Sequence, residues 1–278
     1  MSANLWRAEW LKTRKRPANI GMIIVMLAVL AMAVLAFTGL ALWNGDPDMN
    51  HLENARSVLP FPGGALLAAN VLAGFSALLA IVFVANTVGS EYSRDTWKMI
   101  IPRQGNRLSF LLTKYLLGVV VIVAATFALM AITQVLAWLG ALVLGIDLVS
   151  ADIGGMLSTQ GSEISAMLAD MLFFSTFALL VTVASRSTVS GIVIGFIGMV
   201  LMKAIPGLSR YLALTLPTVH IDNVLGHWAN MPTRVMGAEA AFHRVISPWS
   251  SLAVVLGYMA LFIGVSCLLF KRRDMAGG

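Results

Sequence analysis

Long stretches without a charged side chain constrain this chain more than any other feature of its sequence. Four stretches contain no Asp, Glu, Lys or Arg: Pro17 to Gly45, Ser57 to Ser90, Tyr115 to Ile146 and Val245 to Phe270. About 20 apolar residues in a helix cross the hydrocarbon of a bilayer, and a charge at its centre costs about 2.5–3.5 kcal/mol. Each stretch is therefore predicted to span a membrane.

Two shorter apolar stretches complete the pattern. Met171 to Ser185 and Ser187 to Met202 are predicted to form a hairpin that bends at Ser185 to Thr188. Asp170 and Lys203 then lie near the outer ends of its helices, where their charged groups reach the interface. Because 59% of residues are hydrophobic and 12% charged, against about 25% charged in an average soluble domain, a soluble enzyme is excluded.

The sequence predicts an all-α membrane protein with a single transmembrane domain, residues 1–278, of six transmembrane helices. Helices are favoured over a barrel because the four long stretches exceed 20 residues without alternation. An external loop at 207–247 contains an apolar part, Tyr211 to Val224, that Pro217 interrupts and that is expected to form a short helix on the outer leaflet. The spans are placed at about 19–43, 66–88, 112–145, 166–185, 188–206 and 248–270.

The distribution of cations orients these helices. Fourteen of the 19 lysines and arginines fall in the two terminal segments, the loop between the second and third spans, and the turn at Arg186. Because cytoplasmic loops carry the excess of Lys and Arg, both termini are predicted to be cytoplasmic. These cations lie at the ends of apolar stretches, not on the face of a folded domain, so no nucleic-acid partner is expected.

The N-terminal residues 2–16 combine apolar and basic side chains. Leu5, Trp6, Trp10 and Leu11 fall at helical spacing among five cations. This pattern is typical of an amphipathic helix lying in the headgroup layer of the bilayer. The alternative is a basic segment that only fixes orientation.

The segment 89–107, between the second and third spans, is far richer in charge than its flanks. Ser93 is suited to cap a short helix, in which Trp97, Ile100 and Ile101 form an apolar stripe. The pattern predicts a compact amphipathic helix on the cytoplasmic side. A solvated connector whose charges only fix orientation is the alternative.

This segment resembles the cytoplasmic loop of ABC-2 type permeases. The resemblance lies in the Asp95-Thr96-Trp97-Lys98 core, the Pro102-Arg103 step and the return from Arg107 to Lys114. Asp95 stands where that family usually has glycine, which affects the detail of the helix turn. The basic amphipathic start, six spans and basic tail at Lys271 to Arg273 are similar to the family's layout as well.

The resemblance implies a permease half that works as a homodimer, or with a paralogue, in the bacterial plasma (inner) membrane. Two separate ABC ATPase subunits would bind ATP and Mg, and the chain itself would hold no cofactor. The segment 89–107 would be the coupling helix seated in a groove of the ATPase. The contact residues carried over from the family are Glu91, Arg94, Asp95, Trp97, Lys98 and Arg103.

No motif in the sequence indicates catalysis or a metal centre. The chain has no Gly-x-x-x-x-Gly-Lys-Ser/Thr, His-Glu-x-x-His or Gly-x-Ser-x-Gly pattern, so it is not expected to be an enzyme. Its single cysteine, Cys267, excludes an intrachain disulfide and a cysteine-based zinc site. The external loop holds His220, Asp222, His227, Glu239 and His243 in no recognised ligand pattern, and no metal is predicted.

Polar and small residues within the spans are the remaining candidates. Asn86, Thr133 and Gln134 are predicted to line a substrate path, although such groups more often join helices together. Gly191 and Gly195 give the fifth span a flat face for helix packing, either within the chain or against a second permease.

The function expected from this pattern is that of an exporter permease. It would move a hydrophobic or amphipathic compound, such as a peptide antibiotic, drug or lipid-like molecule, across the membrane. One alternative keeps the fold but gives it a periplasmic maturation or force-transmitting role. The other is a channel or scaffold that needs no nucleotide.

Overall fold

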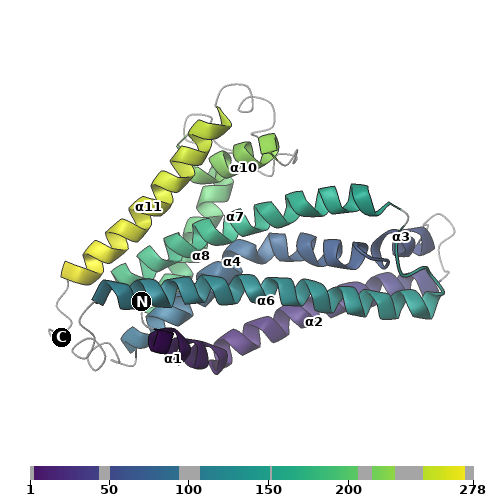
Figure 1. Ribbon diagram of the computed structural model, residues 1–278, viewed down its shortest axis with the longest axis horizontal. Helices are drawn as coiled ribbons and strands as arrows, with labels where there is room; N and C mark the ends of the chain where they lie inside the picture. Colours follow the sequence, from purple (N-terminus) through teal and green to yellow (C-terminus); the bar gives the residue numbers. More distant parts are fainter. Residues whose placement is uncertain are drawn as a thin grey trace.

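The structure is a computed structural model that describes residues 3–43, 51–93, 107–150, 152–205, 215–228 and 247–272. The described chain is all-α, and its long helices run side by side (Figure 1). The helices are α1 (Ala3–Arg14), α2 (Pro17–Leu42), α3 (His51–Val58), α4 (Gly63–Ser93), α6 (Arg107–Leu144), α7 (Ile153–Ser185), α8 (Thr188–Ala204), α10 (Pro217–Trp228) and α11 (Pro248–Arg272).

Five helices in the described residues are long and apolar enough to cross a membrane. They are α2, α4, α6 from Leu108, α7 from Ile164, and α11. The remaining predicted span, the fifth at about 188–206, corresponds to α8, which is equally apolar but has only 17 residues. At 1.5 Å per residue it is about 26 Å long, against a hydrocarbon thickness of about 30 Å.

Several helices extend beyond the predicted spans. α4 continues to Ser93, so the first residues of the segment 89–107 are the last turn of a long helix. α7 begins at Ile153, because the Asp152 side chain accepts a hydrogen bond from the Gly155 N–H at 3.0 Å and caps the helix. The short helix α3 was not predicted.

The short helix predicted after the fifth span differs from its prediction in one respect. α10 begins at Pro217, so this proline opens the helix and does not interrupt it. Proline suits the first turn of a helix, because the N–H that it lacks would have no partner there. Within the expected apolar part, residues 211–214 lie outside the described residues.

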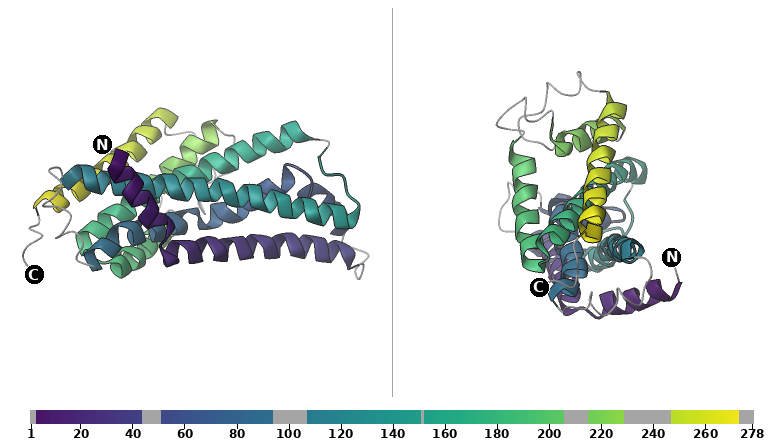
Figure 2. Two further views of the ribbon diagram at one scale, coloured as in Figure 1. Left: turned by 60° about the horizontal axis from the view of Figure 1, so that its bottom comes forward. Right: turned by 90° about the vertical axis from the view of Figure 1, so that its left-hand side faces the viewer.

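α4 is the central helix of the bundle. It packs against α6, α7 and α8 along most of its length, and its small residues allow these helices to approach closely. α2 lies along the outer side of α6, while α10 and α11 pack against each other and against α7. Seen along the bundle, α1 lies across its end (Figure 2, right).

The outward faces of the peripheral helices are apolar. Met32 and Leu35 on α2 and Leu256 on α11 are all more than half exposed. Exposed apolar faces of this extent are typical of helices that contact lipid or an apolar partner.

Candidate functional site

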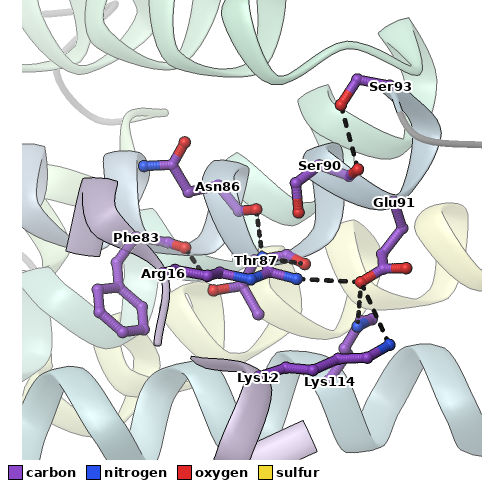
Figure 3. Close-up of polar contacts among 9 residues, drawn as sticks. All are labelled: Lys12, Arg16, Phe83, Asn86, Thr87, Ser90, Glu91, Ser93 and Lys114. Carbon is purple, nitrogen blue, oxygen red and sulfur yellow. Dashed lines mark hydrogen bonds and ion pairs between the residues drawn. The ribbon is translucent and has the colours of Figure 1, made fainter. Parts of the chain in front are cut away.

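Glu91, in the last turn of α4, is the centre of a buried ion cluster (Figure 3). Only 4% of the residue is exposed. Its Oε1 accepts hydrogen bonds from Arg16 Nη2 at 3.0 Å and from Lys114 Nζ at 2.9 Å, and Lys12 Nζ lies 4.0 Å away. We refer to Lys12, Arg16, Glu91 and Lys114 as the Glu91 joint.

Arg16 connects the start of α2 to the end of α4. The backbone at Arg16 is extended, as is usual for a residue that precedes proline, and this sets the corner between α1 and α2. Its Nη1 donates to the carbonyl oxygens of Asn86 at 2.6 Å and Thr87 at 3.0 Å. These two backbone carbonyls lie about two turns before the end of α4, so Arg16 binds the backbone of α4 as well as the Glu91 side chain.

Lys114 connects α6 to the same carboxylate. It is fully buried, and its ammonium group also lies 5.2 Å from the centre of the Phe110 ring. A buried ammonium needs paired charge and hydrogen bonds, because desolvation costs several kcal/mol. The Glu91 joint thus holds α1, the start of α2, the end of α4 and the start of α6 at one place.

A glycine contact brings α8 to the same end of α4. A Cβ added to Gly89 would lie 2.7 Å from Thr188 Cα, which means that the two backbones touch. α8 begins there because Arg186 adopts a left-handed conformation with φ 55° and the Ser187 hydroxyl accepts from the Ser190 N–H. The end of α4 and the start of α8 are therefore in direct contact.

The Glu91 joint is also the place where the predicted coupling segment leaves the helices. α4 ends at Ser93 and α6 begins at Arg107, so residues 94–106 connect two helices that the joint clamps together. Of the six predicted ATPase contacts, Glu91 is buried in the joint, while Arg94, Asp95, Trp97, Lys98 and Arg103 lie outside the described residues. The Ser93 hydroxyl donates to the Ser90 carbonyl at 3.1 Å. The short helix that Ser93 was expected to cap also lies outside the described residues.

Two of the three residues predicted to line a substrate path form hydrogen bonds to protein groups through their side chains. Gln134 is 5% exposed; its Oε1 accepts from the Ala65 N–H at 2.9 Å, satisfying a free amide in the first turn of α4. Thr133 is fully buried and donates to the Leu129 carbonyl one turn earlier. Asn86 is half-buried, and its backbone carbonyl oxygen accepts a hydrogen bond from Arg16.

We predict that Gln134→Met lowers the free energy of unfolding by about 1–3 kcal/mol, because it leaves the half-buried Ala65 N–H without its side-chain acceptor. Its neighbour provides the control, since Thr133→Val removes only a hydroxyl bonded to its own helix. Unfolding of both purified variants by a denaturing detergent, followed by circular dichroism, measures the difference. Equal stability of the two variants would show that Gln134 does not hold α4 in place.

The glycine face of α8 packs within the chain. Cβ atoms added to Gly191 would meet Thr182 on α7 and Ala85 on α4, and one added to Gly195 would meet Ile81 on α4. These glycines therefore allow α8 to lie close to both central helices.

Polar groups also pair away from the Glu91 joint, where Asp170 lies in the middle of α7 and not near its outer end as predicted, and Lys203 lies in the last turn of α8. Asp170 and Lys203, predicted at the outer ends of α7 and α8, form an ion pair of 2.9 Å. On α10, His220 Nδ1 lies 3.0 Å from the Ser251 hydroxyl, to which Asn223 also donates. Within the described residues, no three His, Cys, Asp or Glu side chains gather in a way that would hold a metal ion.

Sequence analysis did not identify the cations of the Glu91 joint. The sequence predicts Lys12 and Arg16 only as cations of the N-terminal amphipathic helix, and Lys114 only as a residue at the start of the third span. These cations precede the first and third apolar stretches and Glu91 follows the second, and this shared side of the predicted membrane was the available signal. The sequence does not show which of the 19 lysines and arginines lie next to the carboxylate of Glu91.

Comparison with known proteins gives a family but no activity. No curated protein matches the chain. A family model described as a protein of unknown function, DUF2705, matches residues 49–276, which is most of the chain and includes α3 to α11. The chain therefore belongs to the DUF2705 family.

Proposed function

We propose that this chain is the membrane subunit of an ATP-driven exporter of the ABC-2 type. It has six spans, with α8 as the short fifth, and both termini in the cytoplasm. Two partner ATPases bind ATP and Mg, and a second copy or a paralogue completes the permease. The cargo is a hydrophobic or amphipathic compound, carried across the bacterial plasma membrane.

The orientation is supported by where the Glu91 joint lies. Three cations of the joint meet at the end of the bundle where α1 begins and where residues 94–106 connect α4 to α6. That end also carries Arg186 and the last-turn cations Lys271 and Arg272. An excess of cations at one end is what the positive-inside rule expects of the cytoplasmic side.

The observation that carries the proposal is the coupling of four helices at the base of residues 94–106. A partner can move the helices through this segment only if the segment is attached to a rigid group of helices. Otherwise the segment itself bends and the helices stay in place. The Glu91 joint attaches the segment to α1, α2, α4 and α6, and the Gly89 contact extends this group to α8. A displacement of the segment is then converted into a rigid-body shift of packed helices.

Such coupling must be reciprocal at equilibrium. If nucleotide binding by the partner favours one packing of the helices, a cargo that prefers the same packing raises the partner's nucleotide affinity. Cargo is therefore expected to change the nucleotide affinity of the assembled complex and not that of the ATPase alone.

The test is replacement of Trp97 and Lys98 by alanine in the complex reconstituted with its ATPase. We expect cargo-stimulated ATP turnover and transport to fall by about tenfold or more, as for the loss of one buried interface anchor of about 2 kcal/mol. The control replaces Trp249 and Lys271 by alanine, which removes the same residue types elsewhere. Unchanged assembly and unchanged turnover in the Trp97/Lys98 variant would count against the proposal and favour a nucleotide-independent scaffold.

A further inference from the structure

An apolar crevice lies between α2, α4 and α6. It is shallow and partly open to the outside of the bundle, and its empty space of about 210 Å³ includes space that is open to the outside. Its one polar side chain, Thr126, donates to the Ile122 carbonyl of its own helix, so the wall presents no free donor. The lining includes Met22, Ile23 and Met26 from α2, Leu79 from α4, and Ala125 and Thr126 from α6.

The three helices that form the crevice also carry the Glu91 joint. Met22 and Met26 follow Arg16 by about 9–15 Å along α2, and Ala125 follows Lys114 by about 17 Å along α6. Leu79 precedes Glu91 by about 18 Å along α4. The crevice therefore lies deeper in the membrane than the cationic cluster, on the same side of the bundle.

Asn19 lies between the cluster and the crevice on α2. It shares a helical face with Ile23 and Met26, at spacings of four and seven residues. The residue is 3% exposed, and neither its amide nitrogen nor its amide oxygen has a partner among the described residues. A buried amide without partners is rare in proteins, and a bound molecule is one source of the missing hydrogen bonds.

The edge of the cluster is basic and accessible. Arg7 on α1 and Lys15 just after it are exposed, and the Lys12 side chain is 45% exposed. α1 runs crosswise to the long helices (Figure 2, right), which is the direction expected of a helix that lies in the headgroup layer of a bilayer. Basic groups at a membrane surface attract anionic headgroups.

We infer that the α2 side of the bundle binds an anionic phospholipid. Its headgroup contacts Lys12 and Lys15, its ester region reaches Asn19, and one acyl chain lies along the open apolar crevice. Met22 and Met26 are flexible enough to adjust to a chain. The inference goes beyond the proposed function, because it requires neither an ATPase nor a cargo.

The test uses the full chain in nanodiscs of phosphatidylcholine that contain a small fraction of photoactivatable lipid. Phosphatidylglycerol or phosphatidylcholine carries a diazirine on its acyl chain, and labelled peptides are identified by mass spectrometry. We expect phosphatidylglycerol to label the peptides holding Met22, Met26 and Ala125 at least about fivefold more than phosphatidylcholine does, as expected for one added cation contact. Unlabelled phosphatidylglycerol should compete, and unlabelled phosphatidylcholine should not.

Two variants with matched controls locate the site. Ala125→Phe fills the crevice and should remove the labelling, whereas Ala124→Phe places the same ring on the exposed neighbouring position and should not. Lys15→Gln should reduce the preference for phosphatidylglycerol by about fivefold, and Lys271→Gln, at the end of α11, should leave it unchanged.

Two results would overturn the inference. One is equal labelling by the two lipids in the unaltered protein, because equal labelling means that the protein does not select the anionic lipid. This result does not depend on whether any variant folds. The other is unchanged labelling in Ala125→Phe. Neither result bears on the coupling role of residues 94–106, so the two proposals are tested separately.

Discussion

Replacement of Glu91 by glutamine is expected to lower the free energy of unfolding by about 3–5 kcal/mol, the usual cost of removing one partner from a buried ion pair. The amide keeps the shape of the side chain but leaves Arg16 and the fully buried Lys114 without their carboxylate. The measurement is unfolding of the purified protein by a denaturing detergent, followed by circular dichroism.

A second substitution tests whether the lost stability comes from the unpaired charge of Lys114. Lys114→Met in the Glu91→Gln background removes a buried charge that has lost its carboxylate, and we expect it to restore about half of the lost stability or more. If the double variant is as unstable as the sum of the two single variants, the pair does not interact as the structure shows. In the reconstituted complex, Glu91→Gln should also uncouple ATP turnover from transport, because residues 94–106 lose their stiff attachment.

Gly89→Ala is expected to have the second largest effect. The new Cβ would lie 2.7 Å from Thr188 Cα and 2.9 Å from its nitrogen, so backbone and not a flexible side chain must move. Overpacking of this kind costs about 1–3 kcal/mol, and here we expect a value at the upper end. The same detergent unfolding measures it, and transport should fall because α8 is pushed away from α4.

The same helix provides the control for this glycine. Gly74, also on α4, has nothing within 4 Å of the position of a Cβ. Gly74→Ala should leave stability unchanged or raise it by roughly 0.5–1 kcal/mol, because alanine favours the helix. Equal effects of the two substitutions would show that α4 and α8 do not touch at Gly89.

The apolar segments could be predicted from the sequence because membrane burial leaves a local signal. Twenty or more residues without a charge define α2, α4, α6 and α11 directly. The helical hairpin of α7 and α8 was also predicted, since its turn at Arg186 carries a charge between two apolar stretches. The extra turns of α4 and α7 were not, because a helix continues into polar sequence wherever caps and packing allow.

The candidate site was predicted only in part, because side-chain pairing between distant segments leaves no local pattern. Glu91 was selected through a family resemblance as a residue that contacts a partner, yet in the structure it contacts Arg16 and Lys114. Those pairs are separated by 75 and 23 residues, and only the packing of α2 and α6 against α4 brings them together.

The same reason explains Gln134 and the glycines of α8. A deep glutamine suits a substrate path as well as a helix contact, and the sequence does not show that the first turn of α4 lies beside it. Gly191 and Gly195 indicate a close approach, but the neighbour is known only from the structure, where it is α4 and α7.

The most direct measurement of the central claim is a photocrosslink from position 97 in native membranes. Benzoylphenylalanine in place of Trp97 is irradiated, and proteins joined to the chain are identified by mass spectrometry, with position 249 on α11 as the control. The account predicts a covalent adduct between position 97 and a protein with a Gly-x-x-x-x-Gly-Lys-Ser/Thr phosphate loop, and none from position 249. Adducts from position 97 with lipid alone would contradict it, since the segment would then have no ATPase bound to it.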